Sequence, residues 1–239
     1  MVPPIPSRPI HLNPAAELAE RVLLPGDPQR ALTMAQALLD GPKMFNARRG
    51  LWGYTGTAPD GGLVTIQSTG MGGPSAAIVV EELIDLGARV LVRTGTCAAL
   101  DGALALGDLM VAASVLPADG ASAALGAERL VKGDARLTDA LAAAAGGGAA
   151  RMVVTTDLFY DPRPGQEDAW RDAGAAAIEM EAATVLTVAA RRGARAACLL
   201  LVSDVLAGDG RARLSDEELE AGGERLGRVA LRALAELQQ

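Results

Sequence analysis

The sequence predicts an α/β protein with a mixed β-sheet. Short runs rich in leucine and β-branched residues alternate with amphipathic stretches, and this alternation is typical of strands and helices that follow one another in a layered fold. The first such units are a strand at 21–24 with a helix at 29–39, and a strand at 63–67 with a helix at 74–86. The turn from Pro59 to Gly62 lies between the apolar runs 52–57 and 63–67 and predicts a hairpin. A hairpin among strand–helix units makes the sheet mixed.

The remaining elements follow the same pattern to the end of the chain. Strands are predicted at 90–93, 109–116, 151–155, 176–178 and 196–202, and helices at 137–145, 181–192 and 216–237. Ser215 and Glu218 form a capping box before the last helix. Residues 121–148, rich in alanine and glycine, are expected to hold a surface loop with a short helix, or to become ordered only on assembly. Since there is no internal repeat and no linker, residues 1–239 are expected to form a single domain.

Composition indicates a cytoplasmic protein that binds a small molecule. Hydrophobic residues make up 50% of the 239 residues, which is enough for a large core. The 22 basic and 29 acidic residues give a net charge of −7 without a basic block, which disfavours nucleic acid and anionic membranes as partners. No apolar run is long enough to span a bilayer, and the start, Met1 to Pro6, lacks the layout of a signal peptide.

Cysteine and histidine usage argues against a metal site. Cys97 and Cys198 lie far apart in apolar, strand-like segments and are expected to be reduced structural thiols. His11 is the only histidine of the chain. A histidine-rich zinc site and a Ser-His-Asp triad within the body of the domain are therefore both disfavoured, and we expect no metal.

Three separate segments combine arginine with glycine or a small hydroxyl residue. They are 25–30 with Gly26 and Arg30, 48–50 with Arg49, and 93–96 with Arg93 and Thr96. Glycine lets the backbone approach an anion closely, and the arginine fork matches the oxygens of a phosphate. A single arginine after a turn is most simply a solvated surface residue, but three in such settings favour a phosphate pocket.

The glycine-rich segment 69–75 lies between a predicted strand and a predicted helix. It does not match the dinucleotide pattern G-x-G-x-x-G followed by an acid about 20 residues later, and no Walker pattern occurs in the chain. Two interpretations stay open. The segment is a tight turn with Pro74 at the first helical position, or a turn in which Met71 contacts a ligand.

Three carboxylates lie in apolar surroundings. Glu179 and Glu181 flank Met180, and on a strand both would point to one face. Because burying an unpaired carboxylate costs several kcal/mol, such residues usually hold something polar. One carboxylate can accept from a sugar diol, although one or both, Glu179 before Glu181, could instead cap the following helix. Asp204 lies at the carboxyl end of a predicted strand, where open α/β sheets bind ligands, or serves as a structural N-cap.

Taken in order along the chain, these segments resemble the purine nucleoside phosphorylase and uridine phosphorylase family, in particular the bacterial hexameric purine nucleoside phosphorylases. The resemblance covers nearly the whole chain. Each motif is weak by itself, but their order is highly specific. The motifs are Pro9 to Asn13, Leu24 to Arg30, Arg49 to Gly56, Gly70 to Ser75, Val92 to Thr96, Asp157 to Tyr160, Ile178 to Ala183 and Val202 to Asp204.

The resemblance implies the nucleoside phosphorylase fold, a single domain in which helices flank a central, mixed and partly barrel-like sheet. It also implies phosphorolysis of purine (2′-deoxy)ribonucleosides, in which inorganic phosphate attacks C1′ and releases the base and (deoxy)ribose 1-phosphate for nucleoside salvage. The residues expected in this site bind phosphate (Gly26, Arg30, Arg49, Arg93 and Thr96), ribose (His11, Met71, Met180 and Glu181) and base (Phe159, Ile178, Glu179 and Ser203).

Within the same resemblance, Asp204 is the expected catalytic residue and gives its proton to N7 of the purine. Breaking the glycosidic bond puts negative charge on the base, so a proton donor stabilises the transition state. A free aspartate has a pKa near ~3.9, so this role needs burial or hydrogen bonds that keep the acid protonated. The family pairs this aspartate with an arginine. Because residues 205–210 diverge from the family pattern, Arg211 and Arg213 both remain candidates.

We expect a homo-oligomer, specifically a hexamer. Phosphate is the expected co-substrate, and no cofactor is expected. The resemblance implies that His11 reaches the ribose 5′-hydroxyl of a neighbouring subunit and that Arg49 crosses the same interface. The alternatives are a uridine phosphorylase, which Asp204 disfavours, a methylthioadenosine-type nucleosidase, which the arginines disfavour, and a non-catalytic nucleoside-binding protein. The sequence predicts neither the preference between 6-oxo and 6-amino purines nor that between ribose and deoxyribose.

Overall fold

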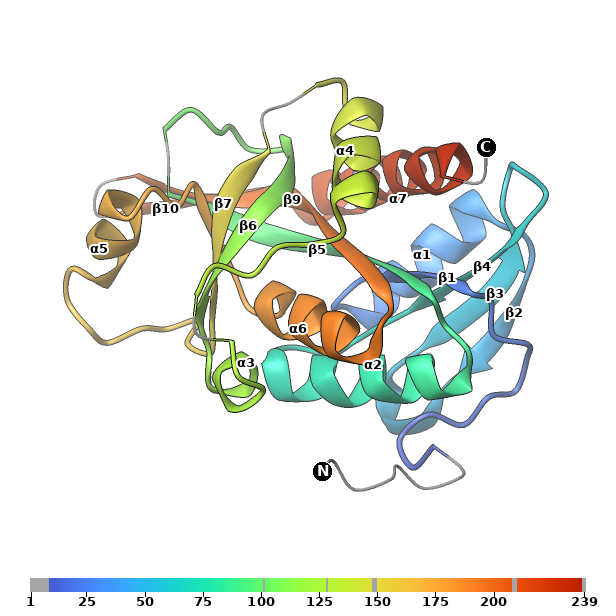
Figure 1. Ribbon diagram of the computed structural model, residues 1–239. Helices are drawn as coiled ribbons and strands as arrows, with labels where there is room; N and C mark the ends of the chain where they lie inside the picture. Colours follow the sequence, from blue (N-terminus) through green and yellow to red (C-terminus); the bar gives the residue numbers. More distant parts are fainter. Residues whose placement is uncertain (1–8, 101, 128, 148–149, 208–209, 238–239) are drawn as a thin grey trace.

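Strands and helices alternate along the chain (Figure 1). A computed structural model describes residues 9–237 except 101, 128, 148–149 and 208–209. Its strands are β1 (Arg21–Leu24), β2 (Asp40–Asn46), β3 (Gly53–Thr57), β4 (Leu63–Gln67), β5 (Val90–Ala99), β6 (Leu109–Ala118), β7 (Arg151–Thr156), β8 (Ala177–Glu179), β9 (Arg195–Ala207) and β10 (Gly210–Arg213). Its helices are α1 (Pro28–Leu38), α2 (Gly73–Leu86), α3 (Gly120–Ala124), α4 (Ala135–Ala144), α5 (Gln166–Asp172), α6 (Ala182–Arg192) and α7 (Asp216–Glu236), with a 3₁₀ turn, η1, at Arg48–Gly50.

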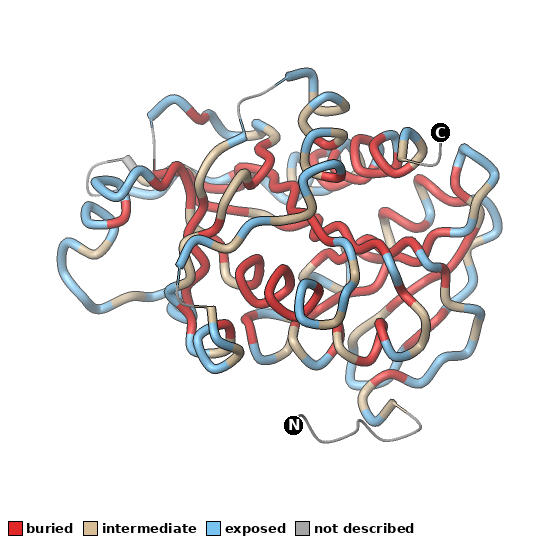
Figure 2. The backbone as a smooth tube through the Cα atoms, in the orientation of Figure 1, coloured by how far each residue is buried: buried red, intermediate tan, exposed pale blue. Residues whose placement is uncertain are grey.

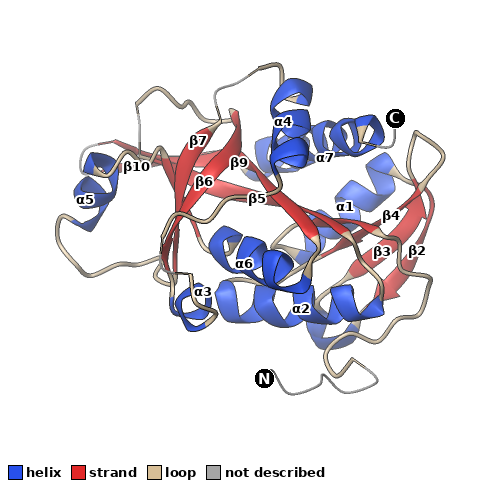
Figure 3. Cartoon of the chain, viewed as in Figure 1, coloured by secondary structure: helices blue, strands red, loops and turns tan. Residues whose placement is uncertain are grey.

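Five of the strands close into a barrel. The sheet runs in the order β10-β9-β6-β7-β8-β5-β1-β4-β3-β2, and β9 also pairs with β5. The strands β9, β6, β7, β8 and β5 therefore form a ring, from which β1 to β4 extend on one side and β10 on the other (Figure 3). β5 pairs with β9 in parallel, whereas β6 pairs with β9 antiparallel. The predicted mixed, partly barrel-like sheet is confirmed.

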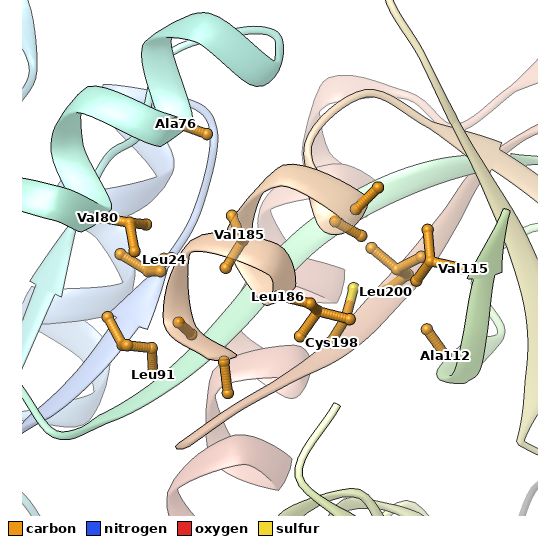
Figure 4. Close-up of a cluster of buried hydrophobic side chains, with 14 of the residues drawn as sticks. Leu24, Ala76, Val80, Leu91, Ala112, Val115, Val185, Leu186, Cys198 and Leu200 are labelled. Carbon is orange, nitrogen blue, oxygen red and sulfur yellow. The ribbon is translucent and has the colours of Figure 1, made fainter. Parts of the chain in front are cut away.

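Helices pack on both faces of this sheet, and the long strand β9 lies between them. α2, α3 and α6 contact one another on one face, while α1 and α4 contact α7 on the other. Successive side chains of a strand point to opposite faces. On β9, Cys198, Leu200 and Val202 join the cluster of α2 and α6, whereas Ala197, Leu199 and Leu201 join that of α1, α4 and α7. Figure 4 shows the first cluster. Burial on both faces explains why the run from Ala196 to Val202 is continuously apolar.

Most elements lie where the sequence predicts them. β1 and β4 have the predicted bounds, and the predicted helices 29–39, 74–86, 137–145, 181–192 and 216–237 correspond to α1, α2, α4, α6 and α7. The capping box is confirmed, because Ser215 Oγ accepts from the Glu218 backbone N–H and the Glu218 carboxylate accepts from the Ser215 N–H. No helix in the described part of the chain is long and apolar enough to cross a membrane. The predicted signal-free start, Met1 to Pro6, lies outside the described residues.

The elements that sequence patterns missed are those with exposed surfaces (Figure 2). β2 and β10 each pair with one strand only, and their residues 40–44 and 210–213 are exposed or half-buried, so neither shows an apolar pattern. α5 buries only Trp170. The segment 121–148, apart from residues 128 and 148, contains most of α3, a loop and α4. Elements that bury little surface leave little hydrophobic periodicity in the sequence.

The contact between α1 and α7 holds the first turn of α1 at the end of the sheet. A Cβ placed on Gly227 of α7 would lie 2.3 Å from Leu38 Cδ1 and 2.8 Å from Met34 Cε, both on α1. A Cβ on Gly223 would lie 3.3 Å from Cδ of Arg30. Glycines on α7 therefore allow the two helices to approach closely and leave room for the arginine.

We expect Gly227→Ala to destabilise the protein. Alanine in a helix interior is ordinarily about 1 kcal/mol more favourable than glycine, but here the added methyl group overpacks a buried contact, which typically costs about 1–3 kcal/mol. Urea denaturation should show a lower midpoint. The matched control is Gly227→Ala combined with Leu38→Ala, in which the shortened side chain makes room and the two effects are non-additive. An unchanged or higher midpoint for the single variant would contradict this packing.

Candidate active site

A cavity of about 820 Å³ opens at the carboxyl ends of the parallel strands β1, β5 and β9. Parallel strands bring their carboxyl ends to one edge of a sheet, where ligands commonly bind. Every predicted site residue except His11 lines it: Gly26, Arg30, Arg49, Met71, Arg93, Thr96, Phe159, Ile178, Glu179, Met180, Glu181, Ser203 and Asp204. Segments far apart in the sequence thus contribute to a single site.

One end of the cavity carries arginine side chains. Arg30 lies in the first turn of α1, where its backbone N–H donates to the N-cap carboxylate of Asp27 at 2.6 Å. Burial lowers the pKa of the Arg30 guanidinium; Asp27 opposes this shift, and the nearby positive charge of Arg93 adds to it. No carboxylate within the described ranges forms an ion pair with Arg30. A half-buried cation without an ion-pair partner is able to bind an anion.

Arg49 lies on the exposed turn η1 at the rim of the same cavity. Its φ of 59° is left-handed, and among the described non-glycine residues it alone has a positive φ. Asn46 supports this turn, since its side-chain amide donates to the Leu51 carbonyl at 2.5 Å and its Oδ1 accepts from the Arg48 N–H at 3.3 Å. Such backbone strain persists only where neighbouring contacts hold it in place.

Arg93 is buried between two carboxylates. Its Nε donates to Glu179 Oε2 at 2.7 Å, and its Nη2 forms an ion pair with Glu181. Burial lowers the pKa of Arg93, but the charges of Glu181 and Glu179 outweigh this effect and raise it, so the guanidinium stays charged. Its Nη1 has no hydrogen-bond partner within the described part of the chain. One edge of the guanidinium is therefore still able to bind an anion.

The side chain of Arg93 explains why position 95, two residues later on β5, is a glycine. Residues two apart on a strand point to the same face. A Cβ at position 95 would lie 2.6 Å from Nη2 and 2.7 Å from Cζ of Arg93. The guanidinium folds back over the glycine, and any side chain there would displace it from Glu181.

Glu179 acts through Arg93 and the start of α6. Its carboxylate accepts from the backbone N–H groups of Glu181 and Ala182 at 2.9 Å and from the hydroxyl of Thr155, in addition to Arg93. The side chain is completely buried. These contacts match the helix-capping interpretation of Glu179 and give no support to a direct contact with a base, because the donors already surround both oxygens.

Glu181 lies between Arg93 and the glycine turn before α2. Its Oε1 accepts from the Gly72 N–H at 2.5 Å, and φ is 73° at Gly70 and 86° at Gly72, so the turn needs glycine at both positions. Burial raises the pKa of the Glu181 carboxyl, and the charge of Arg93 opposes that rise. The segment 69–75 is a tight turn, with Pro74 at the second helical position of α2 rather than the first. Met71 is 86% exposed and borders the cavity, and its contact with a ligand stays a prediction.

Asp204 lines the same cavity and is buried. Ser203 Oγ donates to Asp204 Oδ2 at 2.6 Å. Arg213 is the register partner of Asp204 across β10 and β9, with Nη1 3.6 Å from Oδ1. Arg211 is closer, with Nε 3.2 Å from Oδ1, and its guanidinium lies 4.4 Å from the centroid of the Phe159 ring. The structure therefore places both candidate arginines beside the aspartate, on a strand that sequence patterns did not predict.

Apolar side chains line the space between Asp204 and α5. They are Ala98, Leu158, Phe159, Trp170, Ile178 and Leu206. Leu206 and Trp170 were not predicted as site residues, because hydrophobic residues on a strand and a helix carry no signal that separates a pocket wall from a core. A flat apolar ligand fits such a wall.

The cysteines and the histidine do not take part in this cavity as reactive groups. Burial raises the pKa of the Cys97 and Cys198 thiols, and both are free. Thiols of this kind are poor nucleophiles. Within the described residues, no group of three or more His, Cys, Asp or Glu side chains could hold a metal ion. His11 lies outside the cavity of its own chain, with Nδ1 2.7 Å from Glu82 Oε1.

Comparison with known proteins agrees with this arrangement. The family described as the phosphorylase superfamily matches residues 20–238. The DeoD-type purine nucleoside phosphorylase of Geobacillus kaustophilus (strain HTA426) is 37% identical over 201 residues, which cover 81% of this chain and 84% of the relative. That of Jannaschia sp. (strain CCS1) is 38% identical over 205 residues, covering 82% and 87%.

A solved structure shares the fold as well. The crystal structure of uridine phosphorylase from Vibrio fischeri ES114, complexed with 6-hydroxy-1-naphthoic acid, matches with a TM-score of 0.81 at 26% identity and covers 92% of this chain and 93% of that one. Because the family matches residues 20–238 and the relatives cover more than 80% of the chain at 37–38% identity, the chain belongs to the phosphorylase superfamily.

Proposed function

We propose that the protein is a purine nucleoside phosphorylase, which cleaves purine (2′-deoxy)ribonucleosides with inorganic phosphate and yields the free base and (deoxy)ribose 1-phosphate in nucleoside salvage. The observation that carries the proposal is one cavity whose lining includes Arg30, Arg93 with its unpartnered Nη1, and the buried Asp204. The DeoD-type purine nucleoside phosphorylases to which the chain is similar support it. Phosphate is the co-substrate, and the proposed reaction uses no cofactor.

The arginine end would hold the attacking phosphate. Arg30 and Arg93 supply N–H donors and positive charge, Gly26 and Thr96 line the same end, and Arg49 lies at its rim. Fixed cations stabilise a phosphate without reorganisation during the reaction, which is worth more in a buried site than in water. Positive charge that develops on the sugar in the transition state is in turn stabilised by the bound phosphate.

Ribose would lie against Glu181. Each oxygen of this carboxylate already has one protein partner, Gly72 for Oε1 and Arg93 for Oε2, and each keeps a second lone pair for a sugar hydroxyl. Met71 and Met180 also line the cavity and would provide apolar contacts to the sugar. The carboxylate is fixed in orientation before substrate binds, which lowers the entropic cost of positioning C1′ for attack.

The base would lie between Phe159 and Ile178 with N7 toward Asp204. A protonated Asp204 gives its proton to the departing base, and the resulting carboxylate is then stabilised by Ser203 and by the arginines of β10. We propose Arg211 as the principal partner, because its Nε is nearer than Nη1 of Arg213 and its stacking on Phe159 couples it to the base.

A purine fits this end of the site better than a pyrimidine. A uridine phosphorylase recognises its base with polar side chains and needs no donor for N7, whereas here apolar side chains such as Phe159, Ile178 and Leu206 line the cavity together with the buried carboxyl of Asp204. A nucleosidase that uses water has no need of the arginine end. The preference between 6-oxo and 6-amino purines stays open, since a protonated aspartate can donate to N7 of either.

We further propose that the protein is a cytoplasmic homo-hexamer, in which His11 and Arg49 reach the active site of a neighbouring subunit. His11 does not line the cavity of its own chain, which agrees with a contact to the site of a second copy. Large exposed apolar residues such as Ile10, Met71 and Tyr160 are compatible with burial between subunits. The two free thiols are compatible with a reducing compartment.

Base release should depend on phosphate. With inosine, guanosine or adenosine as substrate, we expect release of the base and equimolar ribose 1-phosphate only when phosphate is supplied. Product analysis by chromatography with and without phosphate checks this. A panel that includes uridine and methylthioadenosine separates the alternatives. Equal base release in phosphate-free buffer would sink the phosphorylase assignment, and a preference for uridine would sink the purine assignment.

Arg30→Gln should raise the KM for phosphate. Loss of charge-assisted hydrogen bonds to an anion costs about 1.5–3 kcal/mol, which corresponds to a rise of roughly 10- to 100-fold. Because burial already disfavours the charged form of Arg30, we expect no loss of stability in a thermal melt. The matched control is Arg228→Gln, an exposed arginine of α7 outside this cavity. An unchanged KM for phosphate in Arg30→Gln would remove this residue from the phosphate site.

Asp204→Asn should lower kcat on inosine by roughly 10²- to 10⁴-fold, the usual contribution of general acid catalysis. A nucleoside methylated at N7 is the chemical control, because its base leaves without protonation and its rate should change little. Arg211→Gln and Arg213→Gln form a matched pair on β10, and we expect the larger loss of kcat for Arg211→Gln. Equal rates of wild type and Asp204→Asn on saturating inosine would exclude the proton donor role.

A further inference from the structure

A buried carboxylate on α2 binds the segment that carries the histidine. The side chain of Glu82 is 7% exposed. It accepts from the backbone N–H groups of Ile10, His11 and Leu12 at 3.0, 3.0 and 2.7 Å, and Oε1 lies 2.7 Å from Nδ1 of His11. Four groups of one short segment therefore converge on a single side chain. In Figure 1 this segment is the dark blue chain beside α2.

These contacts determine the protonation pattern of the imidazole. Burial alone would raise the pKa of Glu82, but the hydrogen bonds from His11 and the three backbone N–H groups lower it below its ordinary value, so the group is a carboxylate. A carboxylate can only accept hydrogen bonds. Nδ1 of His11 must then carry the proton, and in the neutral imidazole Nε2 is left as an acceptor.

The neighbouring contacts hold the segment in the same position. The Asn13 N–H donates to Asn46 Oδ1 at 2.9 Å, and the Ala15 N–H donates to the Phe45 carbonyl at 2.8 Å. Asn46 also supports the turn that carries Arg49. The two residues expected to reach a neighbouring subunit are thus connected through one buried asparagine.

The imidazole keeps a surface for a partner. The His11 side chain is 27% exposed, the adjacent Ile10 is 53% exposed, and no hydrogen-bond partner of Nε2 exists within the described residues. The ring therefore has one nitrogen fixed by the protein and one available from outside. This arrangement, a carboxylate on one nitrogen and a ligand on the other, orients an imidazole and selects its tautomer.

We propose that Glu82 is a positioning residue, which holds His11 as the Nδ1–H tautomer so that Nε2 accepts a hydrogen bond from the substrate's 5′-hydroxyl in a second copy of this chain. The inference rests on the proposed function, in which His11 contacts that hydroxyl. The proposed tautomer would also select substrates by the group at their 5′ position. A 5′-hydroxyl can donate to Nε2, whereas a 5′-ether or thioether presents only lone pairs to another lone pair and is disfavoured.

The tautomer can be measured directly, because His11 is the only histidine of the chain. Long-range ¹H–¹⁵N spectra of the full-length protein labelled at histidine, recorded where the ring is neutral, should show a protonated Nδ1 and a bare Nε2. In Glu82→Gln the amide N–H₂ can donate to Nδ1, so the proton should move to Nε2. A wild-type spectrum with the proton on Nε2 would overturn the proposal without any variant.

Glu81→Gln is the matched control. Glu81 is the preceding residue of α2 and loses the same charge, but it pairs with Arg192 of α6 and does not contact His11. We expect its histidine spectrum to equal that of the wild type. A thermal melt of each variant separates a change of tautomer from loss of the fold.

Kinetics test the consequence for substrate choice. We compare kcat/KM for inosine with that for its 5′-O-methyl derivative, whose ether oxygen accepts but cannot donate. The methyl group of the substrate has the same steric effect in wild type and in each variant. A change in the ratio between them therefore reports hydrogen bonding at the 5′ position. In Glu82→Gln we expect the ratio of kcat/KM for inosine to that for the 5′-O-methyl derivative to fall by about ten-fold, which corresponds to the loss of one hydrogen bond. The change should arise mainly in KM. In Glu81→Gln we expect the ratio to stay unchanged.

The outcomes separate this inference from the proposed function. Phosphate-dependent cleavage with an unchanged tautomer and an unchanged ratio in Glu82→Gln would overturn the role of Glu82 and leave the phosphorylase assignment standing. Phosphate-independent cleavage would overturn the phosphorylase assignment, while the wild-type spectrum still decides whether Glu82 fixes the tautomer.

Discussion

A guanidinium between two carboxylates lies at the centre of this structure, and the rest of the site depends on it. Arg93, Glu179 and Glu181 are all buried, and taking each charge out of water costs several kcal/mol unless partners compensate. The compensation comes from Arg93 Nε and Nη2, from backbone N–H groups at the start of α6, and from the Gly72 N–H before α2. The network thereby joins β5, β8, α6 and the glycine turn. Removing one member would leave the others charged and unpaired.

Closure of the barrel brings this network and Asp204 into one cavity. β5 and β9 pair in parallel from Val90 with Arg195 to Ala99 with Val205, and Ala98 is the register partner of Asp204. Arg93 and Thr96 on one strand and Ser203 and Asp204 on the other therefore open into one cavity. A nucleoside between them would have its phosphate and its leaving base stabilised by groups on adjacent strands, which form a rigid support. Rigid support matters because a misplacement of about 1 Å can cost roughly 10²-fold in rate.

The residues around the cavity act at two levels. Arg30, Glu181 and Asp204 have polar atoms that can meet a ligand, whereas Glu179, Gly95 and Asn46 hold other residues in position. Glu179 shows why the distinction matters. In sequence it stands beside Met180 and Glu181 and looks like part of the same binding motif, yet its carboxylate is used entirely by the protein. The single side chain of Glu179 both caps α6 and orients Arg93.

The sequence by itself determined the α/β class, the bounds of β1 and β4, the capping box of α7 and the family, because each of these rests on local pattern or on the order of motifs. Tertiary structure alone decided which strands close the barrel, the partners of Glu179 and Glu82, and the approach of Arg211 to Asp204. Arg93 and Glu179 lie 86 positions apart and His11 and Glu82 lie 71 apart, and no local periodicity records such pairings. β10 is exposed and apolar residues do not mark it, so its arginines acquire a role only when backbone hydrogen bonds with β9 place them beside the aspartate.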